Sequence, residues 1–265
     1  MSKASKRERQ RLNREARREY EEKQAKRRRT MKTGRRVGIV AAPVVIALIV
    51  ISVVNSGGSS SSRGAGGCQH ASTPPAKHPH LTAPTQGISP SVPYQASIQT
   101  SCGTIQVGLD ASQYPKAVNN FVSLANQGFY DNMAFVRAVK NAGIQAGSPD
   151  QSNQTANTGP GYSVQAETPT TRPGQPAYPI GTVAFAKTGK DPAGTVDSQF
   201  FIVTGSQFTT LPPDYAIVGQ VTGGLPVATK IQSFAPAAGD GPLTKHVVIK
   251  KVKISPGATG TPSTT

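Results

Sequence analysis

The sequence contains no tryptophan, and only two cysteines and four histidines among its 265 residues. His246 is the one histidine after residue 92, so imidazole-based acid–base or nucleophilic catalysis has little to work with. Five of the 13 Asp and Glu residues lie before residue 37, and the other eight are widely scattered. No pattern supports a pair of catalytic carboxylates, although spacing alone does not exclude one.

Motifs of several common enzyme classes are also missing. The sequence has no Gly-x-Ser-x-Gly elbow and no Gly-x-Gly-x-x-Gly that opens a helix after a strand. Gly189-Lys190 lacks the other residues of a phosphate-binding loop. Cys68 and Cys102 have no second cysteine nearby, as a metal site would require, and both one disulfide and two free thiols stay open. We therefore expect no cofactor and no metal.

Positive charge is concentrated at the N-terminus. Residues 1–36 carry 16 Lys and Arg against five acidic residues, which is most of the net charge of +16. The next residues, 37–54, form an uncharged apolar run of a length that spans a bilayer. The positive-inside rule places 1–36 in the cytoplasm and the rest outside, as in a single-pass plasma-membrane protein. The alternatives are a cleaved signal peptide and lipidation of Cys68.

Composition divides the rest of the chain into three parts. Residues 55–92 are rich in Ser, Gly and Pro, which is typical of a linker. Residues 93–254 have the size of a single domain with a sizeable core. Residues 255–265 have the composition of a disordered tail, and the basic segment 1–36 is expected to act mainly as a topology signal. Binding of nucleic acid or anionic lipid by that segment is the alternative, and no specific nucleic acid is expected.

Alternating apolar residues predict two strands over 94–100 and 103–109, joined as a hairpin. A helix follows, with Ser112 as N-cap, Pro115 in the first turn and Gly128 beyond its end.

Further short elements follow in the second half of the domain. Apolar runs that predict strands occur at 181–186, 199–203, 216–218 and 247–249, and a second short helix is predicted at 225–234. Because strands dominate, we expect a mainly β fold, a closed antiparallel barrel or a sandwich rather than a parallel α/β sheet.

One chemistry that needs neither a proton shuttle nor a metal is rotation about an X–Pro peptide bond. Its barrier of roughly 18–20 kcal/mol comes from amide resonance. A catalyst must bind the twisted amide better than the planar forms. That task requires an apolar pocket for the proline ring and a fixed donor, such as an arginine, aimed at the prolyl nitrogen.

Several ordered segments of the domain resemble the cyclophilin family. They are Asn119-Asn120-Phe121, Gly128-Phe129-Tyr130-Asp131, Phe135-Val136-Arg137, Ile144-Gln145-Ala146-Gly147, Gly159-Pro160-Gly161-Tyr162, 181–186, 197–202 and Leu211-Pro212-Pro213-x-Tyr215. The last variant resembles a subgroup of membrane-anchored actinobacterial cyclophilins. The resemblance covers residues 94–254 and implies a closed eight-stranded antiparallel barrel capped by two helices.

The resemblance also implies roles for individual residues. Arg137 matches the cationic donor to the prolyl nitrogen, and Gln145 matches an amide that binds substrate backbone and steadies the arginine. Phe201 matches the floor of the proline pocket. The other matched substrate-binding positions are Phe135, Ala186, Lys187, Gln199, Leu211 and Tyr215, of which Phe135 also matches a core position.

Some positions depart from the family pattern. The usual Phe-Met pair before the glutamine is Ala142-Gly143 here or is lost in a local gap, so the pocket is shallower or is filled from elsewhere. Tyr215 stands in place of a histidine, Thr210 in place of a tryptophan and Lys187 in place of an asparagine. The missing tryptophan argues against tight cyclosporin binding.

We therefore expect a membrane-anchored, monomeric peptidyl-prolyl cis–trans isomerase that acts on proline-containing segments of exported or envelope proteins. The alternative is a proline-peptide-binding chaperone of low activity on the same fold.

Overall fold

The computed structural model describes residues 67–77, 79–152 and 159–256, which all belong to one compact unit. The predicted basic tail 1–36, the predicted span 37–54 and nearly all of the predicted tail 255–265 lie outside these residues. Within the described part of the chain, no helix has both the length and the apolar character needed to cross a membrane.

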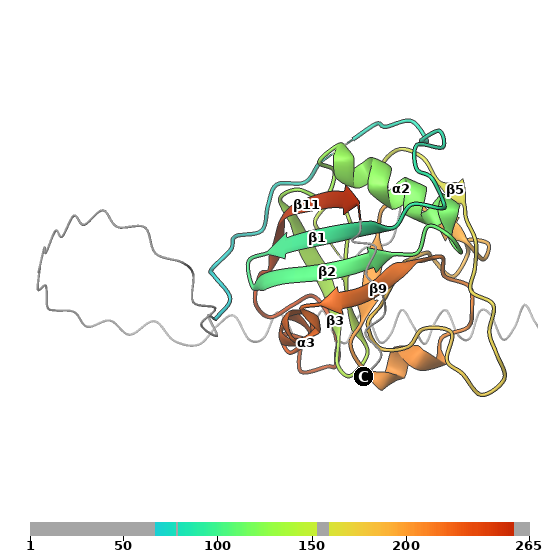
Figure 1. Ribbon diagram of the computed structural model, residues 1–265. Helices are drawn as coiled ribbons and strands as arrows, with labels where there is room; N and C mark the ends of the chain where they lie inside the picture. Colours follow the sequence, from blue (N-terminus) through green and yellow to red (C-terminus); the bar gives the residue numbers. More distant parts are fainter. Residues whose placement is uncertain (1–66, 78, 153–158, 257–265) are drawn as a thin grey trace, which may run out of the picture. The chain divides into compact units, whose positions relative to one another are not determined.

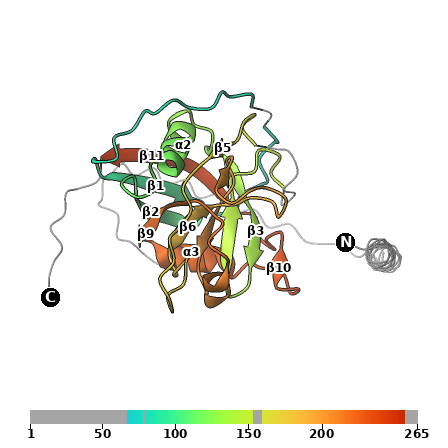
Figure 2. The same ribbon diagram turned by 90° about the vertical axis from the view of Figure 1, so that its right-hand side faces the viewer.

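Eight antiparallel strands form a closed wall (Figures 1 and 2). They are β1 (Tyr94–Thr100), β2 (Gly103–Leu109), β3 (Met133–Val139), β4 (Gly143–Ala146), β6 (Thr182–Phe185), β8 (Phe200–Val203), β9 (Ile217–Gly223) and β11 (Val248–Pro256). Their order is β3-β11-β1-β2-β9-β6-β8-β4, and pairing of β4 with β3 closes the circle. The predicted closed barrel is thus confirmed.

Three two-residue strands complete the sheets. The strand β10 (Asp240–Gly241) pairs with the last residues of β3, beside which it is visible in Figure 2. The strands β5 (Val164–Gln165) and β7 (Thr195–Val196) pair only with each other. None of these short elements has a pattern long enough to be predicted from sequence, but β10 supplies Asp240, which binds Arg137 of β3.

Two α-helices, α2 (Pro115–Asn126) and α3 (Leu225–Gln232), lie at opposite ends of the barrel in Figure 1. The predicted first helix is present, with Pro115 at its start and Gly128 just past its end at φ 69°. Its predicted N-cap is wrong. The helix begins after Tyr114, and the Ser112 hydroxyl instead donates to the Asp110 carboxylate at 2.9 Å.

The barrel interior is a continuous apolar core. Phe121 of α2 stacks on Tyr130 with ring centroids 5.1 Å apart and meets the edge of Phe200 at 5.7 Å. Phe185 is also fully buried there. Closure of the wall around these rings removes them from water, which supplies the main driving force for folding.

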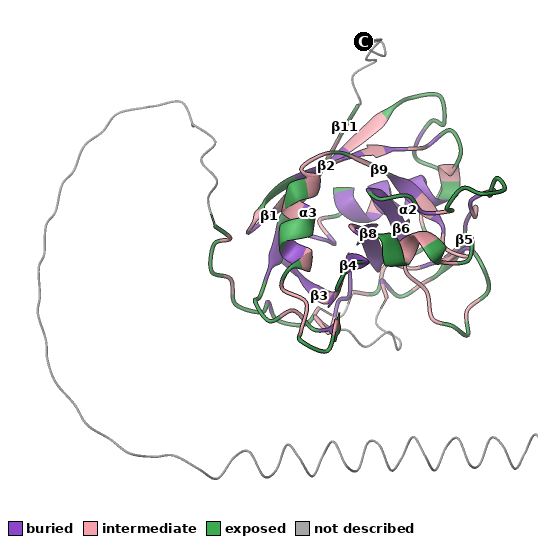
Figure 3. Cartoon of the chain, turned by 90° about the horizontal axis from the view of Figure 1, so that it is seen from below, coloured by how far each residue is buried: buried purple, intermediate pink, exposed green. Residues whose placement is uncertain are grey.

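A second apolar cluster lies on the outside of the barrel wall. Every residue of β4, β6 and β8 is buried, as the purple colour shows in Figure 3, although outward and inward side chains alternate along a strand. The outward side chains are covered by neighbouring segments. Together they form what we call the outer cluster: Ala177, Tyr178, Ala184, Ala186, Phe201, Val203, Phe208, Leu211, Tyr215 and Ile217.

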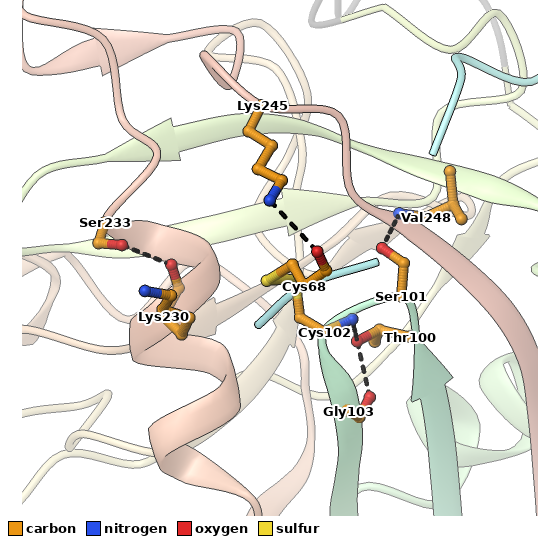
Figure 4. Close-up of a disulfide and its surroundings, with 9 residues drawn as sticks. All are labelled: Cys68, Thr100, Ser101, Cys102, Gly103, Lys230, Ser233, Lys245 and Val248. Carbon is orange, nitrogen blue, oxygen red and sulfur yellow. Dashed lines mark hydrogen bonds between the residues drawn. A yellow bond between two sulfur atoms is a disulfide. The ribbon is translucent and has the colours of Figure 1, made fainter. Parts of the chain in front are cut away.

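The described part of the predicted 55–92 linker lies against the barrel. We call residues 67–77 and 79–92 the strap. A disulfide joins Cys68 to Cys102 at the β1–β2 turn, and the Lys245 amine donates to the Cys68 carbonyl at 3.2 Å (Figure 4). Further along, the Gly87 amide donates to the Asn119 side chain at 2.8 Å. The strap is therefore bound to the domain, and its disulfide leaves no thiol on Cys68 for lipid attachment.

Candidate active site

Strand register aligns four side chains in one row across the outer face of the barrel. Arg137 of β3 pairs with Gln145 of β4, Gln145 pairs with Phe201 of β8, and Phe201 pairs with Ala184 of β6. Paired residues on adjacent strands direct their side chains to the same face. The barrel wall thus brings a cation, an amide and an aromatic ring side by side from sequence positions far apart.

Arg137 is held by a carboxylate from β10. Its Nε and Nη2 atoms each donate to Asp240 at 2.6 Å, and its Nη1 donates to Gln145 at 3.4 Å. The hydrogen bonds between the two side chains lower the pKa of the Asp240 carboxyl and raise the pKa of the Arg137 guanidinium. A guanidinium has five N–H donors, so this fork fixes the group and still leaves donors for a ligand.

A buried pair of amides extends the row. The Gln145 Nε2 donates to the side-chain Oε1 of Gln199 at 2.9 Å, and both side chains are buried. The chain before Gln199 is fixed by Asp197, whose carboxylate accepts from the Gln199 amide at 2.8 Å and from the Ser198 amide. Burial raises the pKa of Asp197. The amide pair therefore has a rigid support.

Three rings surround Phe201. Tyr215 and Phe208 stand edge-on to it with centroids 5.5 Å away, and Tyr178 lies at 6.2 Å. The Tyr178 hydroxyl accepts from the Tyr215 amide at 2.8 Å and donates to the Tyr215 carbonyl at 3.0 Å. Burial raises the pKa of Tyr178, which keeps the hydroxyl neutral. Because Phe208, Leu211 and Tyr215 are only half-buried, the outer cluster opens to solvent.

Most of the predicted substrate-binding residues lie at this place. Phe201, Leu211, Tyr215 and Ala186 belong to the outer cluster, and Gln145 and Gln199 adjoin it. The amine of Lys187 is 5.4 Å from the centroid of the Tyr215 ring.

Phe135 is the exception among the predicted residues. Its side chain belongs to the interior core, and an irregularity in the β3–β4 register between Phe135 and Arg137 separates their two faces. Phe135 therefore packs the barrel and does not line the outer cluster, and the predicted contact with substrate is corrected.

Three residues of the site were missed in the sequence. Asp240 lies 103 residues from Arg137, and nothing in the local pattern connects them. Tyr178 sits in a Pro-rich loop, and Phe208 sits in the 3-10 helix η1 (Ser206–Thr210). For Tyr178 and Phe208, the only available signal was an isolated aromatic residue in a segment without a strand or α-helix pattern.

The chemistry available here is that of binding and orientation. The site combines a fixed guanidinium, two buried amides and an aromatic cluster that opens to solvent at Phe208, Leu211 and Tyr215, and no histidine is part of it. Within the residues that the structure describes, no cluster of His, Cys, Asp and Glu could hold a metal ion. Such a site suits an apolar ring attached to a neutral peptide group.

Residues 95–254 match the family described as cyclophilin type peptidyl-prolyl cis-trans isomerase/CLD. The chain belongs to this family. Among solved structures, a cyclophilin-type isomerase of Cryptosporidium parvum has a TM-score of 0.51 and 25% sequence identity, covering 62% of this chain and 99% of that one. A second structure of that protein, with a TM-score of 0.50, was obtained in the presence of the dipeptide Ala-Pro.

Curated bacterial peptidyl-prolyl cis-trans isomerases are also similar in sequence. The probable peptidyl-prolyl cis-trans isomerase B of Mycobacterium leprae is 32% identical over 203 residues, 71% of this chain and 66% of the relative. The corresponding protein of Mycobacterium tuberculosis is 33% identical, over 70% of this chain and 63% of the relative. Isomerase B of Bacillus subtilis is 36% identical over 51% of this chain and 83% of its own length. The chain thus spans just under two thirds of the length of its mycobacterial relatives.

Proposed function

We propose that this protein is a peptidyl-prolyl cis–trans isomerase whose site is the row of Arg137, Gln145 and Phe201. The observation that carries the proposal is the register of β3, β4 and β8, which sets the guanidinium beside the aromatic rings around Phe201. We take the space between the half-buried rings of Phe208 and Tyr215 over Phe201 as the recess for a proline ring. Membership of the cyclophilin family supports the same reaction.

The mechanism follows from amide electronics. The proline ring enters the recess over Phe201, and the Gln145–Gln199 pair binds the peptide backbone. As the X–Pro bond twists, resonance is lost and the lone pair localises on the prolyl nitrogen. The Arg137 guanidinium donates to that nitrogen, and this bond exists only in the twisted state, so it lowers the barrier rather than merely tightening binding.

The decisive experiment compares two arginine variants of the purified full-length chain in a prolyl isomerisation assay. Arg137→Ala is expected to lower kcat/KM by at least about 100-fold, as loss of one transition-state donor commonly does. Arg172→Ala is the control, because Arg172 is exposed in a loop and its side chain takes no part in the row. Full activity in Arg137→Ala would overturn the mechanism.

The alternative is a proline-peptide-binding chaperone of low activity. It is favoured by Ala142-Gly143, where the family pattern has two larger side chains. The two functions separate on one measurement: a peptide that binds the wild-type chain but isomerises at the uncatalysed rate supports the chaperone and excludes the enzyme.

We further propose that residues 37–54 anchor the protein in the plasma membrane, with the domain outside the cytoplasm and exported proteins as substrates. The apolar run with its basic N-terminal flank supports this topology. The Cys68–Cys102 disulfide supports an oxidising compartment. Thiols are to be alkylated in intact cells and counted before and after reduction. Two free thiols before reduction, or release of the protein from membranes by carbonate, would overturn the proposal.

A further inference from the structure

The outer face of β4 lacks a side chain at the position next to the row. Gly143 and Gln145 lie two residues apart and so face the same side of the wall. A Cβ atom on Gly143 would lie 2.9 Å from two ring carbons of Phe208 and 2.6 Å from the Ile202 carbonyl oxygen. Strand β4 therefore has no room for its own side chain there, and the Phe208 ring occupies that space.

The segment that carries Phe208 is fixed to the β3–β4 turn. The amides of Thr204 and Gly205 donate to the Ala142 carbonyl at 2.9 and 3.0 Å, and the Gln207 amide donates to the Asn141 carbonyl at 3.0 Å. A Cβ on Gly205 would lie 2.4 Å from the Asn141 carbonyl carbon, so this close approach requires glycine. The ring is thus held in register with the strand that carries Gln145.

Phe208 contacts the recess as well as the gap at Gly143. Its ring meets Phe201 edge-on at 5.5 Å, and it belongs to the outer cluster together with Leu211 and Tyr215. It remains half-buried, so part of the residue is open to solvent. Phe208 packs against Phe201 on one side and is open on another. It therefore lies where an incoming apolar ring would make contact.

We infer that Phe208 is a specificity-determining wall of the recess and sets the size of the ring that the recess accepts. This inference rests on the proposed function, because it assigns the substrate contact of the same site. A rigid aromatic wall excludes larger rings sterically and gives contact area to a proline ring. In apolar pockets one added methylene commonly changes kcat/KM by roughly 10-fold or more.

The test measures ring-size discrimination with the full-length chain and two peptides, one with proline and one with pipecolic acid, its six-membered homologue. In Phe208→Ala we expect kcat/KM for the proline peptide to fall about 10-fold and the proline-to-pipecolate ratio to fall at least about threefold. Phe208→Leu, which keeps part of the bulk, should lie between this variant and the wild type. The ratio is informative because a general loss of folded protein lowers both rates equally.

Phe234→Ala is the matched control. Phe234 is also half-buried, but it packs against the interior core beyond α3, with Lys230 and Lys245 near its ring. This variant should keep the wild-type ratio.

The possible failures are distinguishable. If the wild-type chain isomerises the proline peptide but Phe208→Ala keeps the wild-type ratio, the inference is overturned and the enzyme function stands. If the wild-type chain does not isomerise the peptide, the enzyme function itself is overturned. If Phe234→Ala changes the ratio as much as Phe208→Ala does, the effect comes from a general loosening of the fold, and the role of Phe208 is rejected.

Discussion

The two sides of the barrel wall differ in how they are buried. On β1 and β2, buried positions alternate with half-buried or exposed ones, as in a wall with one wet face. On β4, β6 and β8 every position is buried. The difference shows that the side of the barrel with β4, β6 and β8, which we call the layered side, carries an additional apolar layer. We call the side with β11, β1 and β2 the plain side. Arg137 and its amide partners lie at the edge of the additional layer.

The contrast is sharpest between two adjacent residues. Phe200 and Phe201 are neighbours on β8 and both are buried, but Phe200 belongs to the interior core and Phe201 to the outer cluster. A change at one should affect mainly stability, whereas a change at the other should affect mainly substrate binding.

The largest expected effect comes from exchanging these two rings for alanine. Phe200→Ala creates a closed cavity beside Phe121 and Tyr130, and should lower the free energy of unfolding by about 3–5 kcal/mol. Phe201→Ala should cost less, about 1–3 kcal/mol, because two of the three rings around it, Phe208 and Tyr215, are only half-buried and can close in. Urea denaturation measures both values.

The activity of the same variants completes the comparison. We expect Phe201→Ala to lose most of its kcat/KM and Phe200→Ala to keep kcat/KM when corrected for the folded fraction. Equal losses of both quantities in both variants would mean that the two clusters form one cooperative unit.

The second prediction concerns the strap, which meets the barrel at the β1–β2 turn, away from the outer cluster. Cys68→Ser removes a crosslink with a sequence separation of 34. A loop of this length corresponds to roughly 2–4 kcal/mol of unfolding free energy. We expect the melting temperature to fall while kcat/KM is unchanged at a temperature where the variant is folded. If Cys68→Ser has the stability of the wild type, the disulfide contributes little by restricting the unfolded chain.

The sequence predicted some strands on each side of the barrel and missed or shortened others. The β1–β2 hairpin was assigned with its observed bounds, because alternation is visible along both strands. The strands β3 and β4 were not assigned from pattern. The first is almost continuously apolar, and the second is four residues long and begins with glycine. The strands β6 and β8 are equally buried but were predicted, because their apolar runs stand between turn residues. On the other side, β11 was predicted only at 247–249, because lysines interrupt its apolar run.

The candidate site divides in the same way. Resemblance to a family pointed to Arg137, Gln145 and Phe201, which the register then aligned in one row. Asp240 and Phe208 were missed because the first lies on a two-residue strand and the second on a short 3-10 helix. Their positions depend on long-range packing, which no local pattern records.

The third prediction concerns the support of Arg137. Asp240→Asn keeps the shape but removes the charge, and we expect kcat/KM to fall several-fold through a less ordered guanidinium. Stability should change by less than about 1 kcal/mol, because the pair is substantially exposed. Unchanged kcat/KM would show that Gln145 alone orients the arginine.

The pH dependence of this pair has a defined sign. Arg137 lowers the pKa of Asp240 below its ordinary value of 3.8. The stabilisation is therefore complete above that value and is lost as the pH falls through the lowered folded-state pKa. The stability difference between wild type and Asp240→Asn should be present near pH 7 and shrink near pH 3, as measured by urea denaturation. A difference that persists in acid would mean that the carboxylate acts through packing rather than charge.

The smallest expected effect tests whether the layered side of the barrel selects substrates by charge. Lys187 lies beside the recess, with its amine near the Tyr215 ring and donating to the Asp191 carbonyl at 3.1 Å. Lys187→Gln should lower kcat/KM two- to threefold for a peptide with Glu near its proline, and leave a neutral peptide unchanged. Salt near 1 M, where the Debye length is about 3 Å, should abolish the difference.

The control is Lys253→Gln on β11, an exposed lysine of the plain side, which should leave kcat/KM for both peptides unchanged. If the neutral peptide loses as much as the acidic one, the lysine acts by holding the Tyr215 ring, and its charge has no part in selection.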